Sequence, residues 1–288
     1  MQRSRLSQAR PTSDSVLLAL LLFAVAVVLS ACFELEQTLE IRADGTGRLI
    51  VKLSMQKEKL RQLEQRLRGL EAGPGDTGTV QGHPFDIERI RRSFKPLEHV
   101  RLTKIERFTT ETSSGIHVAI DFDSTEALAK GMAALVSRRD AGIANRMQIW
   151  FVRGPQHRVR MIVYPSGRAE YDRSREQVAS YAKLSAEQRT RQAQMFGMMR
   201  HSLEGLRITY RFVVPGKIFR HGDAQKVSDS EVVFRIVGDR VKSMSEMTRL
   251  SGLRFEIEFD GAAFTGQLLD AEPSRKPVAP SGGPSGGK

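Results

Sequence analysis

Alternation of apolar and polar residues predicts a β-hairpin early in the chain. Between residues 33 and 41 apolar side chains occupy every second position, except at Gln37, and charged or hydroxyl side chains fill the rest. A period of two indicates a strand with one buried face. Asp44-Gly45 then predicts a tight turn, because glycine tolerates positive φ. Leu49, Val51 and Leu53 continue the alternation on the return strand.

The same patterns predict two more hairpins, at 100–122 and 147–164, the second turning at Gly154-Pro155-Gln156. Further strands are expected at 206–214, 231–237 and 253–259. Helices are expected at 56–72, 87–94, 123–136, 174–203 and 240–250. This order of elements predicts an α+β fold, with a mainly antiparallel sheet of hairpins packed with several helices.

The segment before the first strand resembles a signal for export. Residues 16–29 form an uninterrupted apolar run of 14 residues, preceded by Arg3, Arg5 and Arg10. A membrane-spanning helix needs about 20 apolar residues. The run is therefore short for a span and typical of the apolar region of a signal peptide.

The apolar run ends in Leu29-Ser30-Ala31-Cys32, which contains the chain's single cysteine. These four residues resemble the lipobox of bacterial lipoproteins. The resemblance implies cleavage before Cys32, palmitate-type acyl chains on its sulfur and attachment to the cell membrane. The alternative is an incidental or buried cysteine behind an ordinary signal peptide.

We expect three segments: a lipoprotein signal peptide at 1–31, an α+β domain at 32–271, and a disordered tail at 272–288 rich in proline, glycine and serine. Whether the domain divides into two subdomains is left open. The lipobox resemblance implies a protein exported from the cytoplasm and facing the periplasm. Phe33, in place of an aspartate after the cysteine, favours the outer membrane where the organism has one.

A second resemblance covers two segments. LEIRADGTGRLIVKL at 39–53 and YRFVVPGKIFRHGDAQKVSDSEVVFRIVGD at 210–239 are similar to parts of the LppM-type bacterial lipoprotein domain. Pro215-Gly216 takes the place where a strand ends in that family, and Phe234 the apolar centre of the next strand. The resemblance implies a membrane-tethered α+β module with proposed lipid or glycolipid binding.

The net charge indicates the class of partner. The chain carries +12, of which residues 1–31 contribute +2, so the remainder carries +10. Such a charge favours anionic lipids or glycans, and export argues against nucleic acid. Four arginines around the third hairpin are candidate contacts for anionic headgroups, at about 1 kcal/mol each; a solvated face is the alternative. They are Arg146, Arg153, Arg158 and Arg160.

Two apolar groups are candidates for a ligand groove. Met195, Met198 and Met199 are predicted on one helix face, and methionine adapts to irregular apolar ligands. Trp150 and Phe151 lie in a strand that is apolar on both parities. For both groups, ordinary packing in the core is the favoured interpretation and a groove is the alternative.

Nothing in the sequence predicts catalysis, a metal site or a cofactor. The six histidines show no metal-ligand spacing, and no nucleophile motif is present. The glycines at 282–287 fit a phosphate-loop pattern only formally, since no strand or helix flanks them. The sequence favours a non-enzymatic envelope module that binds a lipid, glycolipid or other amphipath. The alternative is an envelope assembly protein that binds another protein.

Overall fold

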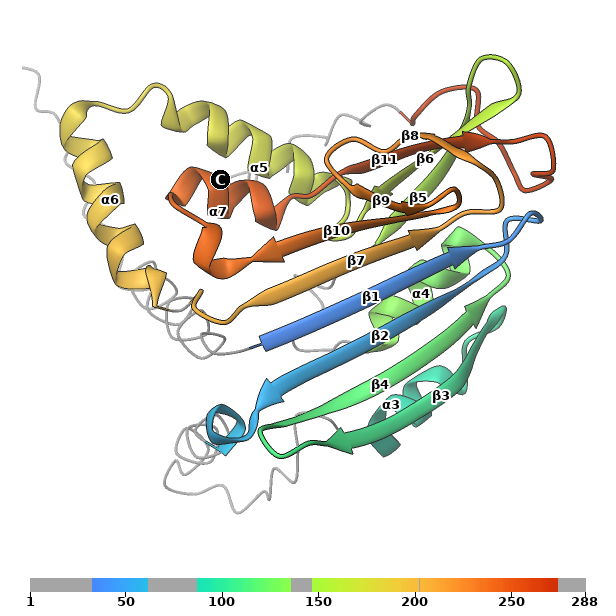
Figure 1. Cartoon of the computed structure of the whole chain (residues 1–288), viewed down its shortest axis with the longest axis horizontal. Helices are drawn as coiled ribbons and strands as arrows, with labels where there is room; N and C mark the ends of the chain where they lie inside the picture. The colour runs from blue at the N-terminus through green and yellow to red at the C-terminus, as the bar shows by residue number, and fades with distance from the viewer. Residues whose placement is uncertain (1–32, 62–86, 136–146, 202, 274–288) are drawn as a thin grey trace, which may run out of the picture.

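The computed structural model describes residues 33–61, 87–135, 147–201 and 203–273. Within these residues eleven strands form two sheets (Figure 1). The large sheet has the order β3 (Val100–Thr109), β4 (Ser113–Phe122), β2 (Gly47–Gln56), β1 (Phe33–Ile41), β7 (Arg207–Val213), β10 (Glu231–Val237), β9 (Gln225–Ser228). The small sheet has the order β5 (Gln148–Arg153), β6 (Arg158–Tyr164), β11 (Phe255–Asp260), β8 (Ile218–Arg220).

Helices and turns connect these strands. The helices are α3 (Ile87–Phe94), α4 (Thr125–Leu135), α5 (Arg168–Tyr181), α6 (Ala186–Arg200) and α7 (Met244–Ser251). A further helical segment begins at Lys57, directly after β2, and is described as far as Arg61. The predicted α+β class and the mainly antiparallel pairing are confirmed, since β1–β7 is the parallel pair among otherwise antiparallel strand pairs.

Three expectations differ from the structure. The strands were expected to form one sheet, and they form two. The helix predicted at 174–203 is two helices, because Ser185 starts α6 with a capping box in which its hydroxyl accepts from the Gln188 amide. Strands β8 and β9 were not predicted, since each is too short to show an alternating pattern.

The core lies between the layers. One face of the large sheet packs against α3, α4 and the small sheet, and buried residues from all of them form one apolar cluster. The opposite face carries the charged parity of β1 and β2 and faces the viewer in Figure 1. The apolar alternation seen in the sequence therefore selects the face that is covered.

The small sheet is covered on its second face by α5. Val152, Ile162 and Tyr164 are buried there, with Trp150 and Tyr171 packed around them. A third apolar cluster joins α6 to α7 and is centred on Phe196, Val241 and Met244.

Gly47, the first residue of β2, lies where side chains have no room. A Cβ there would lie 2.3 Å from the Glu40 carbonyl oxygen and 2.4 Å from Cζ of Phe122. A Cβ at Gly197 of α6 would meet no atom within 4 Å.

We therefore expect Gly47→Ala to lower the free energy of unfolding by about 1–3 kcal/mol through overpacking. Gly197→Ala, the same chemical change inside a helix, should raise it by about 0.5–1 kcal/mol. Urea denaturation of both variants checks this. Equal effects of the two changes would contradict the packing at Gly47.

Candidate functional site

A groove of about 660 Å³ runs between α3 and the edge strand β3. Its volume is within the range of small-molecule sites. Five apolar side chains line it, together with Thr103 and four basic side chains. The apolar residues are Phe94, Leu97, Val100, Leu102 and Ile105, and the basic residues are Arg91, Lys95, Arg101 and Lys104.

The local sequence explains how these side chains reach one groove. Helix α3 buries Ile90 and Phe94 and leaves Arg91 exposed, and the chain then turns through 95–99 into β3. A β-bulge between Leu102 and Lys104 shifts the register against β4. The Thr103 hydroxyl donates to the Ala119 carbonyl at 3.2 Å, which ties the bulge to β4. Bulges at sheet edges re-aim side chains in this way.

The groove is electropositive. No carboxylate lies among its lining residues. Arg101 shares Asp121 with Arg48, and the Arg48 contact is the shorter, at 2.6 Å against 3.6 Å. Hydrogen bonding and charge from Arg48 also hold the pKa of Asp121 below its ordinary value, against the effect of burial. The Arg101 side chain is 78% exposed, and its contact with Asp121 places it on the charged face of the large sheet beside Arg48.

The other basic side chains of the groove differ in their partners. Arg91 pairs with Glu88 at 2.7 Å, and Lys104 pairs with Glu106 at 2.6 Å. Lys95, in the turn directly after α3, has no carboxylate within 4.0 Å among the described residues. An anionic group entering the groove can therefore pair with Lys95 without displacing an existing partner.

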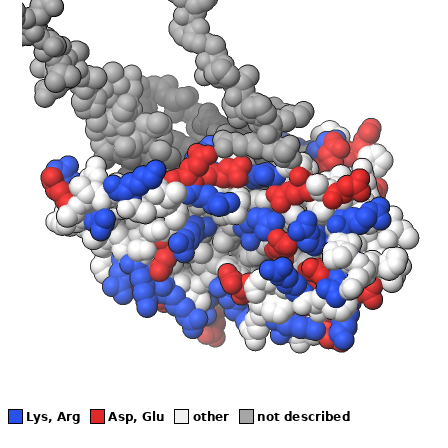
Figure 2. All heavy atoms as spheres, turned by 90° about the horizontal axis from the view of Figure 1, so that it is seen from above, with Lys and Arg blue, Asp and Glu red and all other residues white. Residues whose placement is uncertain are grey.

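Two smaller hollows have mixed charge. One, of about 170 Å³, lies on the charged face of the large sheet and is lined by Glu34 and Glu36 as well as Lys52 and Arg207. The other, of about 270 Å³, is lined by Asp223 and Glu256 as well as Arg220 and Arg254. Figure 2 likewise shows basic and acidic side chains interleaved on the face seen from above. The α3–β3 groove differs from both hollows because no carboxylate is among its lining residues.

The residues predicted to form an apolar groove lie apart. Phe151 points into the main core and is 5% exposed. Trp150 points to the opposite face of β5, where it contacts the ring of Tyr164. On α6, Met199 packs toward Phe196, whereas Met195 and Met198 are 42% and 66% exposed. The favoured interpretation, that these side chains pack in the core, is thus right for Phe151 and Met199 and wrong for Met195 and Met198.

The predicted headgroup arginines are engaged by acidic residues. Arg158 pairs with Glu258 at 2.7 Å and stacks over Phe219. Arg160 lies 3.6 Å from Glu256, and Arg153 lies 3.6 Å from Asp270 but stays 65% exposed. Arg146 and Cys32 fall outside the described residues.

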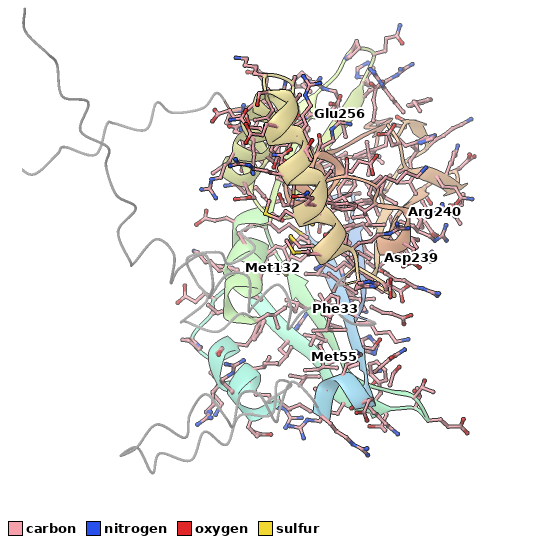
Figure 3. All side chains as sticks on the ribbon, turned by 90° about the vertical axis from the view of Figure 1, so that its left-hand side faces the viewer. Phe33, Met55, Met132, Asp239, Arg240 and Glu256 are labelled. Atoms are coloured by element: carbon pink, nitrogen blue, oxygen red, sulfur yellow. The ribbon has the colours of Figure 1, made fainter. Side chains whose placement is uncertain are left out.

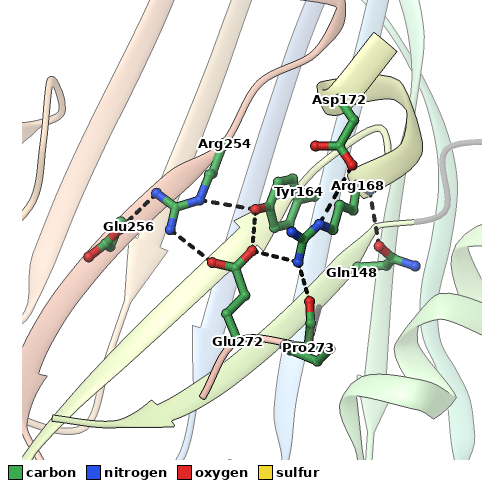
Figure 4. A network of polar contacts seen from close by, with 8 residues as sticks. All are labelled: Gln148, Tyr164, Arg168, Asp172, Arg254, Glu256, Glu272 and Pro273. Carbon is green, nitrogen blue, oxygen red and sulfur yellow. Dashed lines mark hydrogen bonds and ion pairs between the residues drawn. The ribbon is translucent and has the colours of Figure 1, made fainter. Parts of the chain in front are cut away.

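Around Trp150 and Tyr164 the structure builds a polar network (Figure 4). The Tyr164 hydroxyl donates to Glu272 at 2.6 Å and accepts from Nε of Arg254 at 3.0 Å. Glu272 also pairs with Arg168 at 2.9 Å, and Arg254 pairs with Glu256 at 2.7 Å. Glu272 is the first residue of the predicted tail, and these contacts hold it against the small sheet. Trp150 itself lies against the Tyr164 ring, at 5.3 Å between centroids, and under the Arg168 guanidinium at 5.8 Å.

Other site types find no support in the described part of the chain. No group of three histidine, cysteine, aspartate or glutamate residues there could hold a metal ion. No helix in the described ranges is both long and apolar enough to cross a bilayer.

Comparisons with known proteins find distant similarity to solved structures. No protein-family model matches the sequence, and no curated protein matches it. Among solved structures, the folded domain of the LppM protein of Mycobacterium tuberculosis, determined by NMR, is similar at 8% identity and a TM-score of 0.36. The match covers 80% of this chain and 91% of that domain. We therefore base the site on this chain's own geometry.

Two tyrosines have raised pKa values because of their surroundings. Burial, and then the hydrogen bond to Glu272, raises the pKa of Tyr164 to about 12. Burial alone raises the pKa of Tyr210 to about 12. Both values lie above the ordinary value of about 10.

Since the folded pKa is raised, the stability these tyrosines contribute is present below pH ~10 and is lost as pH rises toward ~12, by up to about 3 kcal/mol for Tyr210 and by less for Tyr164, whose hydroxyl is partly screened by solvent. Titration of tyrosinate absorbance in the folded protein, with urea denaturation at each pH, checks this. Tyr164→Phe should remove part of the late absorbance change. A single transition near pH 10 would contradict the described burial.

Proposed function

We propose that this protein is a non-enzymatic envelope module that binds an anionic amphipath, such as an acidic lipid or glycolipid, in the α3–β3 groove. The observation that carries this proposal is a groove lined by five apolar and four basic side chains, with no carboxylate among the lining residues. An acyl chain would lie against Leu97, Leu102 and Ile105. The acidic headgroup would meet Lys95 and Lys104.

We further propose that Cys32 carries acyl chains that anchor the protein to the membrane after export. The lipobox-like sequence before it supports this assignment, and Phe33 favours the outer membrane in an organism that has one. Two or three acyl chains give stable anchoring, whereas one gives only reversible binding. In this proposal the partners are the membrane and the bound amphipath, and no cofactor takes part.

A second candidate function is assembly of envelope proteins. It is favoured by the position of β3, which is an edge strand of the large sheet. An edge strand can pair with an extended segment of another protein. The bulge and the basic side chains of β3 act against such pairing, as in other protected edges, so the amphipath is our first proposal.

Cys32→Ala tests the anchor. Wild-type protein expressed in bacteria should incorporate labelled palmitate and remain with the membranes after cell disruption. The Cys32→Ala chain should incorporate none, because the sulfur that receives the acyl chain is gone. Ala31→Gly keeps a small residue before the cysteine and should retain the label. Equal labelling of the wild-type and Cys32→Ala proteins would refute the attachment site.

Charge reversal in the groove tests the binding site. Lys95→Glu and Lys104→Glu should each weaken binding at least about five-fold, since each cation near an anionic headgroup contributes about 1 kcal/mol. The probe is a fluorescent short-chain phosphatidylglycerol, used as monomers and titrated into the purified full-length protein. A zwitterionic probe with the same chains should bind more weakly and lose little in either variant.

Lys183→Glu is the matched control. Lys183 is also exposed, lies in the turn directly after a helix, and makes no side-chain ion pair among the described residues. It should leave the affinity unchanged. If all three variants bind the anionic probe like wild type, the groove is not the site. The edge-strand proposal then takes precedence.

A further inference from the structure

Helix α6 presents two exposed methionines at its C-terminal half. Met195 and Met198 are 42% and 66% exposed, among the few large apolar side chains so exposed in the described residues. Three positions apart, they lie side by side on the helix surface. The adjoining side of α6 packs Phe196 and Met199 in one apolar cluster with Val241 and Met244. The methionines therefore lie on the side of α6 turned away from the core.

Tight turns fix the end of α6 to the large sheet. The Leu203 amide donates to the Arg200 carbonyl, and the Leu206 amide donates to the Leu203 carbonyl. The amide of Gly238, at the end of β10, donates to the Leu206 carbonyl at 2.8 Å. A Cβ at Gly238 would lie 1.9 Å from the Leu203 carbonyl oxygen, so the two segments are in direct contact. The position of α6 is therefore set by the sheet.

That end of the sheet is also where β1 begins. β1 and β7 are parallel, and Glu34 lies opposite Arg207. Cys32 is one residue before Phe33, so acyl chains on Cys32 would enter the bilayer directly beside this end. Figure 3 looks at this end, with Phe33, Asp239 and Arg240 labelled and α6 in front of the sheet. With no linker after the anchor, this end must face the membrane.

The charges at this end suit an anionic surface. Arg200, Arg240 and Lys242 are exposed and have no carboxylate within 4.0 Å among the described residues. The nearby carboxylates have other partners. Glu204 contacts His201, Glu34 contacts Arg207, and Asp239 accepts from the Gly205 amide.

We infer that the C-terminal half of α6 rests on the bilayer that holds Cys32, with Met195 and Met198 in the interface between headgroups and acyl chains. The cations beside them contact anionic headgroups, at about 1 kcal/mol each. Unbranched methionine side chains adapt to such an irregular surface. This inference rests on the proposed acylation of Cys32 and does not depend on the α3–β3 groove.

The test uses the chain's single cysteine. Because acylation blocks the Cys32 sulfur, an introduced cysteine is the only free thiol in the mature lipoprotein. Met198→Cys, labelled with a polarity-sensitive fluorophore, is reconstituted into liposomes of phosphatidylglycerol and phosphatidylcholine. Val227→Cys on β9, 52% exposed, is the matched control. Brominated lipids in the same liposomes quench any probe that lies within the bilayer.

The expected result is a blue-shifted emission for the Met198→Cys probe, which brominated lipid quenches, and an unshifted, unquenched emission for the Val227→Cys probe. Liposome flotation reports anchoring separately. If the protein floats and both probes stay unquenched, the inference about α6 is overturned and the anchor stands. If the protein does not float, the assignment of Cys32 fails, and the inference about α6 fails with it.

Discussion

The parallel pairing of β1 with β7 is the contact on which the rest of the structure depends. It places Leu39 opposite Phe212 and so joins the N-terminal hairpin to the C-terminal half of the chain in one sheet. Phe212 and Tyr210 then contact the ring of Phe255, with centroids 5.1 Å apart in each case, which links the large sheet to the small one. Buried residues of both halves form one continuous apolar cluster behind this pairing.

The local sequence pattern was sufficient to predict those elements whose own residues show a clear periodicity or turn signal. The hairpin at Asp44-Gly45, helix α3 and strand β10 appear where alternation or helical spacing indicates them. Gln37, the polar break in β1, still points to the buried side, and its Oε1 has no hydrogen-bond partner among the described groups. Packing of its neighbours decides the face of the strand, and one polar residue does not reverse it.

Tertiary pairing decided what local pattern could not. Nothing in the sequence of 147–164 shows that this hairpin pairs with β11 to form a separate sheet. The methionines of α6 illustrate the same limit. Residues 195, 198 and 199 share one side of the helix by their spacing, but the packing of Phe196 buries only Met199 in part and leaves the other two exposed.

The sequence shows the two groups of residues that line the groove, but it does not show that they come together. The basic residues of α3 are apparent as a run, and the apolar residues of β3 as a strand. Their convergence depends on the register shift at Leu102 and Lys104 and on the turn at 95–99. A bulge of one residue has no composition signature here, so the site could not be predicted.

The direction of the strands has a consequence for what the groove can do. Val100, which lines the groove, lies level with Ile41, at the end of β1 opposite Phe33, because Phe122 and Gly47 connect them across the sheet. Phe33 and Ile41 are eight steps of about 3.3 Å apart along the strand, or about 25–30 Å. If Cys32 is acylated, the far end of β1 would therefore stand above the membrane by a distance similar to the thickness of the hydrocarbon core of a bilayer. In the proposed arrangement, an amphipath in the groove would lie at the level of the middle and far end of β1, above the bilayer surface that holds Cys32.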